Sequence, residues 1–159
     1  MRLYQLLYIS DATEPMDTDA LEEMVERFRR RNRERGVTGV LFYSAGHFIQ
    51  LLEGKRETIE SLFKTIQADP RHRNVRRLLI APADRRIFEV WDMGLLNLDE
   101  RSELDQERLV RLVREAERPR GRAGFAPLPL RLLAEFCMML PRPTPSNGHT
   151  RRGKPPPKS

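Results

Sequence analysis

Residues 37–53 read VTGVLFYSAGHFIQLLE, which is two apolar runs joined by the pair Ala45-Gly46. Short runs rich in β-branched and aromatic residues, separated by two residues that include a glycine, are typical of a β-hairpin. The stretch therefore predicts two strands, 37–44 and 47–53, with a tight turn between them.

The segments on either side of this hairpin alternate between strand and helix patterns. Asp19 and Glu22 are expected to cap the first helix, and Gly36 is expected to end it. The order β-α-β-β-α-β-β contains the ferredoxin-like arrangement in its first six elements, so we expect an α+β fold with an antiparallel-dominated sheet and two helices on one face. The elements added to the hairpin are strand 2–10, helix 19–35, helix 55–68, strand 75–81 and strand 86–93.

The composition changes after residue 100. Two more helices are predicted, over about 103–117 and over 130–140, and the second is strongly apolar. They are expected to cover the open face of the sheet and to present a surface to a second copy or to a partner. From Pro141 the tail is rich in proline and basic residues, so it is expected not to fold. The predicted domains are 1–98, a helical extension over 99–140 and a tail over 141–159.

The charge is unevenly distributed along the chain. The net charge is +6, yet residues 1–100 carry 16 Lys and Arg against 17 Asp and Glu. The basic excess therefore lies in the C-terminal part, which argues against nucleic-acid binding by the main domain. A ferredoxin-like nucleic-acid-binding module is still the alternative function, because such sheets bind RNA through exposed aromatics. Strand 47–53 lacks the Gly-Phe-Gly/Ala-Phe pattern that this alternative needs.

Few residues point to enzyme chemistry or to a membrane. The histidines, His47, His72 and His149, lie in no Ser-His-Asp, Cys-His or metal-ligand spacing, so neither a catalytic nor a metal site is expected. No apolar run is long enough to span a membrane. The single cysteine, Cys137, excludes an internal disulfide and fits a reducing compartment. These features predict a cytoplasmic protein that is not an enzyme.

Three polar residues interrupt the apolar patterns. Asn32 continues the apolar stripe of helix 19–35, where its amide either finds a buried partner or caps the helix end. Gln50 lies in a strand with two apolar faces, so it is expected to be buried. Its amide can donate, accept and be turned over, or it can simply bond a neighbouring strand. Tyr8, taken alone, would be a core residue with a hydrogen-bonded hydroxyl.

Two further groups have ordinary interpretations when taken alone. Trp91 and Met93 fall on one face of the predicted strand 86–93, where large side chains fill a core. The charged run after helix 55–68 is commonly a solvated turn. This second group consists of Asp69, Arg71 and His72.

Taken together, these residues lie in an ordered series of motifs. Tyr8 is in LLYIS, Asn32 is followed by GVTGVLFY, and Gln50 is in FIQLLEG. DPRH and FEVWDMG come after them. Over roughly residues 1–95 the chain resembles the BLUF family, the sensors of blue light using FAD, of a short stand-alone type.

The resemblance implies a flavin, FAD or in its place FMN or riboflavin, that lies between the two helices and meets the sheet edge-on. Asn32 would hold the polar pyrimidine edge of the ring. Arg31 and Arg71 would serve the ring carbonyl or the phosphates, and Asp69 and His72 would anchor the mouth. Some family members have a second Asn at the position of Arg31, whereas arginine only donates. The apolar slot would be lined by Met24, Phe28, Phe48 and Ile66.

The resemblance also implies a photochemical mechanism. Tyr8 would donate an electron and a proton, and Gln50 would rearrange by rotation or tautomerisation, which shifts the absorption to the red. Trp91 and Met93 would relay the change to the C-terminal helices. We see no output domain in the sequence, so a separate signalling partner is expected, either a cyclic-dinucleotide phosphodiesterase or a response-regulator-like protein. A homo-oligomer is also expected, without a membrane or a nucleic acid as partner.

Overall fold

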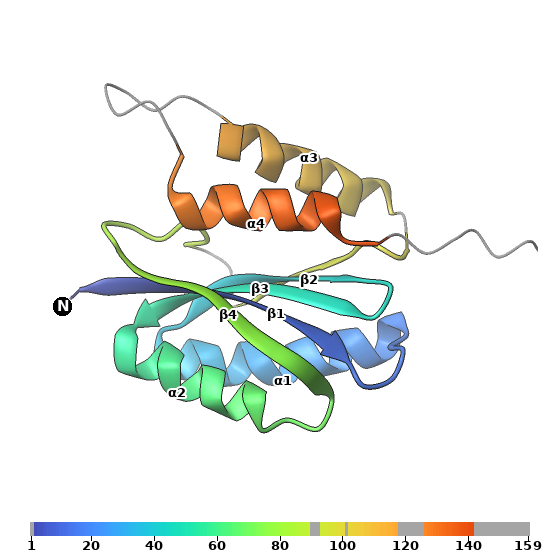
Figure 1. Ribbon diagram of the computed structural model, residues 1–159, viewed down its shortest axis with the longest axis horizontal. Helices are drawn as coiled ribbons and strands as arrows, with labels where there is room; N and C mark the ends of the chain where they lie inside the picture. Colours follow the sequence, from blue (N-terminus) through green and yellow to red (C-terminus); the bar gives the residue numbers. More distant parts are fainter. Residues whose placement is uncertain (1, 90–92, 101, 118–125, 142–159) are drawn as a thin grey trace, which may run out of the picture.

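The computed structural model describes residues 2–89, 93–100, 102–117 and 126–141, with residues 115–117 described by their backbone alone. A five-stranded sheet lies between two helical layers, with α1 and α2 on one face and α3 and α4 on the other (Figure 1). This is the predicted α+β, ferredoxin-like fold. The elements are β1 (Leu3–Ala12), α1 (Thr18–Arg35), β2 (Thr38–Ser44), β3 (His47–Lys55), α2 (Arg56–Gln67), β4 (His72–Ala83), β5 (Gly94–Asn97), α3 (Glu103–Glu117) and α4 (Leu128–Met139).

The predicted hairpin forms the middle of the sheet. The strand order is β4-β1-β3-β2-β5, and the pairs are antiparallel except for β2 with β5, which is parallel. At the turn, Ala45 and Gly46 both have positive φ, 47° and 81°. Two such residues give the turn a twist that matches the twist of the strands. Since β3 has a partner on each side, Gln50 is held in a central strand.

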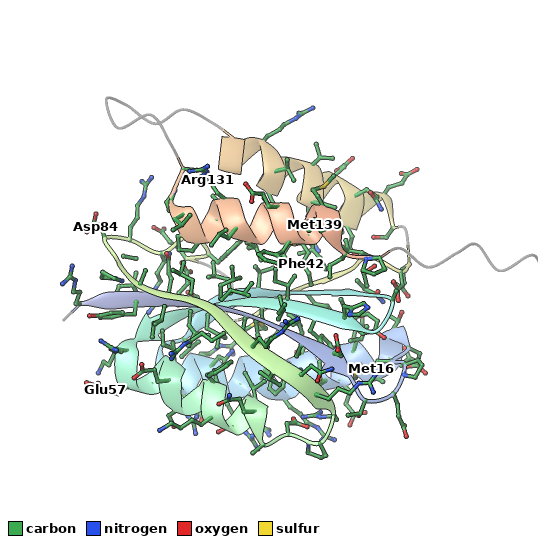
Figure 2. The ribbon with its side chains drawn as sticks, viewed as in Figure 1. Met16, Phe42, Glu57, Asp84, Arg131 and Met139 are labelled. Carbon is green, nitrogen blue, oxygen red and sulfur yellow. The ribbon has the colours of Figure 1, made fainter. Side chains whose placement is uncertain are left out.

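Each face of the sheet has its own apolar core. Successive strand residues point to opposite faces, so Tyr8 packs with α1 and α2 whereas its neighbour Leu7 packs under α4. Phe42 lies between the sheet and α4 (Figure 2), in the same core as Leu133 and Cys137. The C-terminal helices thus cover the face of the sheet that the first two helices leave open.

The last strand differs from the prediction. Residues 86–89 are not in a strand, residues 90–92 lie outside the described part, and β5 begins only at Gly94. The physical reason is that the main-chain N–H groups of Ile87 and Phe88 donate to the carboxylate of Glu53, at 2.6 and 3.0 Å. A side chain therefore satisfies the hydrogen bonds that a strand neighbour would otherwise have made.

Two other boundaries also differ. β4 continues through Pro82, which pairs with Tyr4, because β4 is an edge strand and the missing N–H of a proline is tolerated on the open edge. Helix α1 is capped by Asp17 rather than Asp19, since the Ala20 N–H donates to Asp17 Oδ1 at 2.8 Å. Gly36, in the left-handed conformation with φ 65°, ends the helix as predicted.

The carboxylate of Glu53 is completely buried. Besides the two N–H groups of the 86–88 segment, it accepts from Gln5 Nε2 at 2.8 Å and from Thr38 Oγ1 at 3.0 Å. Four donors around two oxygens compensate the loss of hydration. Glu53 therefore ties the segment after β4 to the central strand.

We expect Glu53→Gln to lower the free energy of unfolding by about 3 kcal/mol, because an amide nitrogen would then face donors that need an acceptor. Urea unfolding of both proteins measures this difference. The matched control is Glu57→Gln on the exposed side of α2, with an expected change below about 0.5 kcal/mol. Equal losses for the two variants would contradict the role given to Glu53.

Candidate functional site

Tyr8 and Gln50 face each other directly across the β1–β3 pair. Their side chains are almost fully buried, at 1% and 2% exposure, and the Tyr8 hydroxyl donates to Gln50 Oε1. On its other side the Gln50 amide Nε2 donates to Met93 Sδ at 3.0 Å. The structure thus joins three of the predicted residues into one chain, Tyr8–Gln50–Met93. Trp91, the other predicted relay residue, lies outside the described residues.

The surroundings of Tyr8 keep its hydroxyl protonated. Burial raises the pKa of Tyr8 well above its usual range, and the nearby carboxylate of Asp69 raises it further. Phe63 of α2 packs on the tyrosine ring at 5.5 Å between centroids. Tyr8 is therefore a neutral donor, and the oxygen of Gln50 is the acceptor that this geometry provides.

The residues predicted to line the slot come from α1, β3 and α2 and belong to one core. Met24, Phe48 and Ile66 are buried, and Phe28 is half-buried at the edge of the same core. Asn32 is only 1% exposed in the last turn of α1, so its amide lies inside the protein. Arg31, in contrast, is an exposed residue of α1.

The charged run after α2 is organised by a carboxylate. Asp69 accepts from the Arg71 main-chain N–H at 2.9 Å and from the guanidinium at 2.6 to 3.2 Å. These bonds hold the pKa of Asp69 below its usual range. The Arg71 guanidinium also lies 5.8 Å from the centre of the Phe28 ring. The run therefore connects the end of α2 to α1 and is more than a solvated turn.

His72 is a buried polar residue with one unused nitrogen. Its Nδ1 lies 2.8 Å from Ser10 Oγ, and its ring packs at a tilt of 39° against Phe48, with 4.7 Å between centroids. Among the described residues, Nε2 of His72 is the buried side-chain nitrogen or oxygen that has no hydrogen-bond partner. Burial lowers the pKa of His72, so the ring is neutral and this nitrogen is available to a group from outside the chain.

Sequence reasoning missed Ser10, Arg29 and Glu53. Ser10 shares the strand face of Tyr8, so periodicity could have pointed to it. Glu53 is a carboxylate in an apolar central strand, which is also a detectable signal. Arg29 donates from Nε to the main-chain carbonyl of Met93 at 2.9 Å, and nothing in the sequence pattern distinguishes it from the other arginines of α1.

The described residues contain a further groove, which is acidic. This groove of about 660 Å³ between α1, β5 and α3 contains none of the predicted site residues. Its many carboxylates do not suit a group that carries phosphates. Within the described ranges, no cluster of three or more His, Cys, Asp or Glu could hold a metal ion, and no helix is both long and apolar enough to cross a membrane.

The fold and the buried site define a class of small α+β domain that places an amide–tyrosine pair in the apolar core between a sheet and two helices. Comparison with known proteins gives the family: the model for "BLUF: Sensors of blue-light using FAD" matches residues 3–94. The chain belongs to the BLUF family. Its matched region is a blue-light sensor domain that uses FAD, which favours this function over the nucleic-acid-binding alternative.

The relatives differ in what they carry besides this domain. The blue light- and temperature-regulated antirepressor BluF of Escherichia coli (strain K12) is 39% identical over 96 residues, which is 60% of this chain and 24% of that protein. A photoactivated adenylate cyclase subunit beta of Euglena longa is 38% identical over 99 residues, 61% of this chain and 12% of that one. This chain thus spans a quarter or less of these relatives.

Solved structures agree with the family. The dark-state structure of BlrB, a BLUF protein, superposes with a TM-score of 0.61 at 28% identity, covering 70% of this chain and 81% of that chain. Klebsiella pneumoniae BlrP1, solved with FMN and cyclic diGMP, gives a TM-score of 0.68 at 31% identity. That match covers 86% of this chain and 34% of BlrP1.

The residues present fit a flavin. The pyrimidine edge of the ring alternates donors and acceptors, and the buried amides of Asn32 and Gln50 can each do both. The unpartnered Nε2 of His72 offers a further polar contact. The apolar side chains of the core suit the flat ring system, as in most cofactor sites.

Proposed function

We propose that this chain senses blue light through Tyr8 and Gln50, which act on FAD held between α1 and α2, and that Met93 carries the change onward. The observation that supports this most directly is the unbroken chain of hydrogen bonds from the Tyr8 hydroxyl through the Gln50 amide to the Met93 sulfur. Trp91 is the second relay candidate of the proposal.

In this proposal different side chains contact different parts of the cofactor. Asn32 holds the pyrimidine edge, and Arg71 serves a ring carbonyl or the phosphates while Asp69 fixes its guanidinium. His72 completes the mouth. The exposed position of Arg31 suits a phosphate better than the ring. The apolar walls are Met24, Phe28, Phe48 and Ile66. The same ring is present in FMN and riboflavin, so either fits the slot.

Bound flavin supplies blue-light absorption and, once excited, a strong oxidant. Tyr8 is the residue placed to respond, because its hydroxyl is protonated and already directed at Gln50 Oε1. A proton that leaves the phenol has this oxygen as its nearest described acceptor. The protein thereby keeps the reacting proton on a defined line between two buried side chains.

Gln50 can exist in two orientations with different neighbours. In the structure its oxygen faces Tyr8 and its nitrogen faces Met93. If the amide turns over, the nitrogen leaves Met93, and a thioether cannot donate to the oxygen that replaces it. A local change in hydrogen bonding thus releases a side chain that lies next to β5, the kind of bistable element a switch needs.

The output is proposed to occur through another protein, and this chain itself is proposed not to be an enzyme. The relatives include adenylate cyclases and an antirepressor, and BlrP1 was solved with cyclic diGMP. A cyclic-dinucleotide phosphodiesterase or a response-regulator-like protein suits this pattern. Residues 1–98 form the sensor in this scheme, 99–140 the part that touches the partner and 141–159 a tail, and the protein is cytoplasmic.

Self-association is supported by the outer helices. Several large apolar side chains of α3 and α4 are exposed, which is typical of a contact surface. We propose that a second copy, or the partner, covers them. They are Leu104, Val110, Leu128, Met138 and Met139.

The experiment that tests the proposal is reconstitution of the purified chain with FAD. The protein is expected to become yellow, and blue light is expected to move the flavin absorption reversibly to the red. Absorption spectra in the dark, under light and during dark recovery measure this. A chain that binds no FAD, or one whose spectrum does not move, would refute the proposal.

A further inference from the structure

The segment that follows β4 is tied to the sheet on the face opposite Gln50. Alternation along β3 places Glu53 with Ile49 and Leu51 on the α4 side, and Phe88 packs in that core. The Glu53 carboxylate holds the N–H groups of residues 87 and 88. Arg86 adds bonds to the main-chain carbonyls of Gly36, at 2.6 Å, and of Glu53, at 2.9 Å.

Met93 is the first described residue after the gap at 90–92, and it packs on the other face of the sheet. Met93 is 1% exposed and belongs to the core of Tyr8, α1 and α2. Its sulfur faces Gln50, and its main-chain carbonyl accepts from Arg29 Nε at 2.9 Å. The same guanidinium bonds Glu26 at 3.2 Å, which orients it along α1.

The two bonds that hold Met93 differ in strength. A thioether is a weak acceptor for an amide N–H, whereas a guanidinium bound to a carbonyl makes a charge-assisted bond, which is roughly twice as strong as a neutral one. Arg29 therefore does more than Gln50 to keep Met93 in place. β5 begins at the next residue and pairs with β2 at Val40, so the backbone position of Met93 sets where this four-residue edge strand starts.

We infer that Arg29 is a positioning residue of the light response. It holds the Met93 carbonyl on the α1 side of the sheet, presents the sulfur to Gln50 and keeps β5 paired in the dark. When the Gln50 amide no longer donates to the sulfur, the remaining Arg29 bond determines how far Met93 and β5 move. This inference rests on the proposed function, because it assigns a role in transmitting the change at Gln50.

The test uses the full chain with FAD and compares Arg29→Ala, Arg29→Lys and, as a control, the exposed neighbour Arg30→Ala. Hydrogen exchange of the Gly94–Asn97 amides is measured in the dark and under light, together with the red shift and its dark recovery. For Arg29→Ala we expect a red shift of normal size and dark exchange of β5 about tenfold faster, as expected for the loss of one charge-assisted hydrogen bond.

For the same variant we expect the light-minus-dark difference at β5 to collapse, since the strand is already loosened, and dark recovery to change severalfold. Arg29→Lys should restore most of the protection because an ammonium also donates to a carbonyl, and Arg30→Ala should match the wild type. Wild-type exchange in Arg29→Ala, or loss of its red shift, would overturn the inference. A wild-type chain without a red shift would refute the proposed function, while the dark exchange series would still decide whether Arg29 holds β5.

Discussion

Replacing Tyr8 by phenylalanine is expected to leave FAD bound and to abolish the light-induced red shift. The ring that packs on Phe63 is retained, so the apolar environment changes little. The hydroxyl that donates to Gln50 is lost, and with it the proton and the electron donor of the proposed mechanism. Absorption spectra before and after blue light measure the shift, and the flavin content of the purified protein measures binding.

The chain offers a matched control for this variant. Tyr43 is also 1% exposed and lies in the same core, where its hydroxyl accepts from the Met16 N–H at 3.0 Å. Both substitutions remove one hydrogen bond, buried for Tyr8 and partly buried for Tyr43, which costs about 1 kcal/mol. Tyr43→Phe is therefore expected to be destabilised to a similar degree and to keep the red shift. A normal photocycle in Tyr8→Phe would contradict the role given to this residue.

Replacing Gln50 by alanine is expected to remove the red shift as completely as Tyr8→Phe does. The variant loses the amide that accepts from Tyr8 and donates to Met93. The buried Tyr8 hydroxyl is then left without its acceptor and a small cavity forms. Together these effects lower the free energy of unfolding by about 2 to 4 kcal/mol. Urea unfolding and difference spectra measure the two effects separately.

Gln5 provides the control, because it is an equally buried glutamine on the neighbouring strand. Its amide donates to Glu53 at 2.8 Å, away from Tyr8. Gln5→Ala is expected to destabilise the protein comparably and to leave the red shift intact. If both glutamine variants lost the shift in proportion to their stability, the effect would be one of folding and not of a switch.

The predictions for Glu53 and Arg29 concern the path from the site to the rest of the molecule. Glu53 anchors Phe88 from one face of the sheet, and Arg29 holds the main-chain carbonyl of Met93 from the other. A change at Gln50 therefore acts between two anchors of unequal strength. The 86–88 segment is held firmly by Glu53, and Met93 is held more weakly. The weaker anchor is next to β5, which contacts α3, and α3 packs on α4.

The helical pattern left open whether Asn32 finds a buried partner or caps its helix, and the structure buries it. The sequence by itself determined the ferredoxin-like order of elements, the central hairpin and the burial of Tyr8 and Gln50. These features depend on periodicity, turn residues and ordered motifs, all of which are local along the chain.

Only the tertiary structure decided where the last strand begins, and which residues hold Met93. The interactions responsible join Glu53 to Phe88 and Arg29 to Met93, which are 35 and 64 residues apart. No local pattern encodes such a pair, since the donors and acceptors meet only after the sheet has formed and its two faces are covered. Residues 86–89 therefore have the pattern of a strand, although the N–H groups of Ile87 and Phe88 donate to the Glu53 carboxylate of β3.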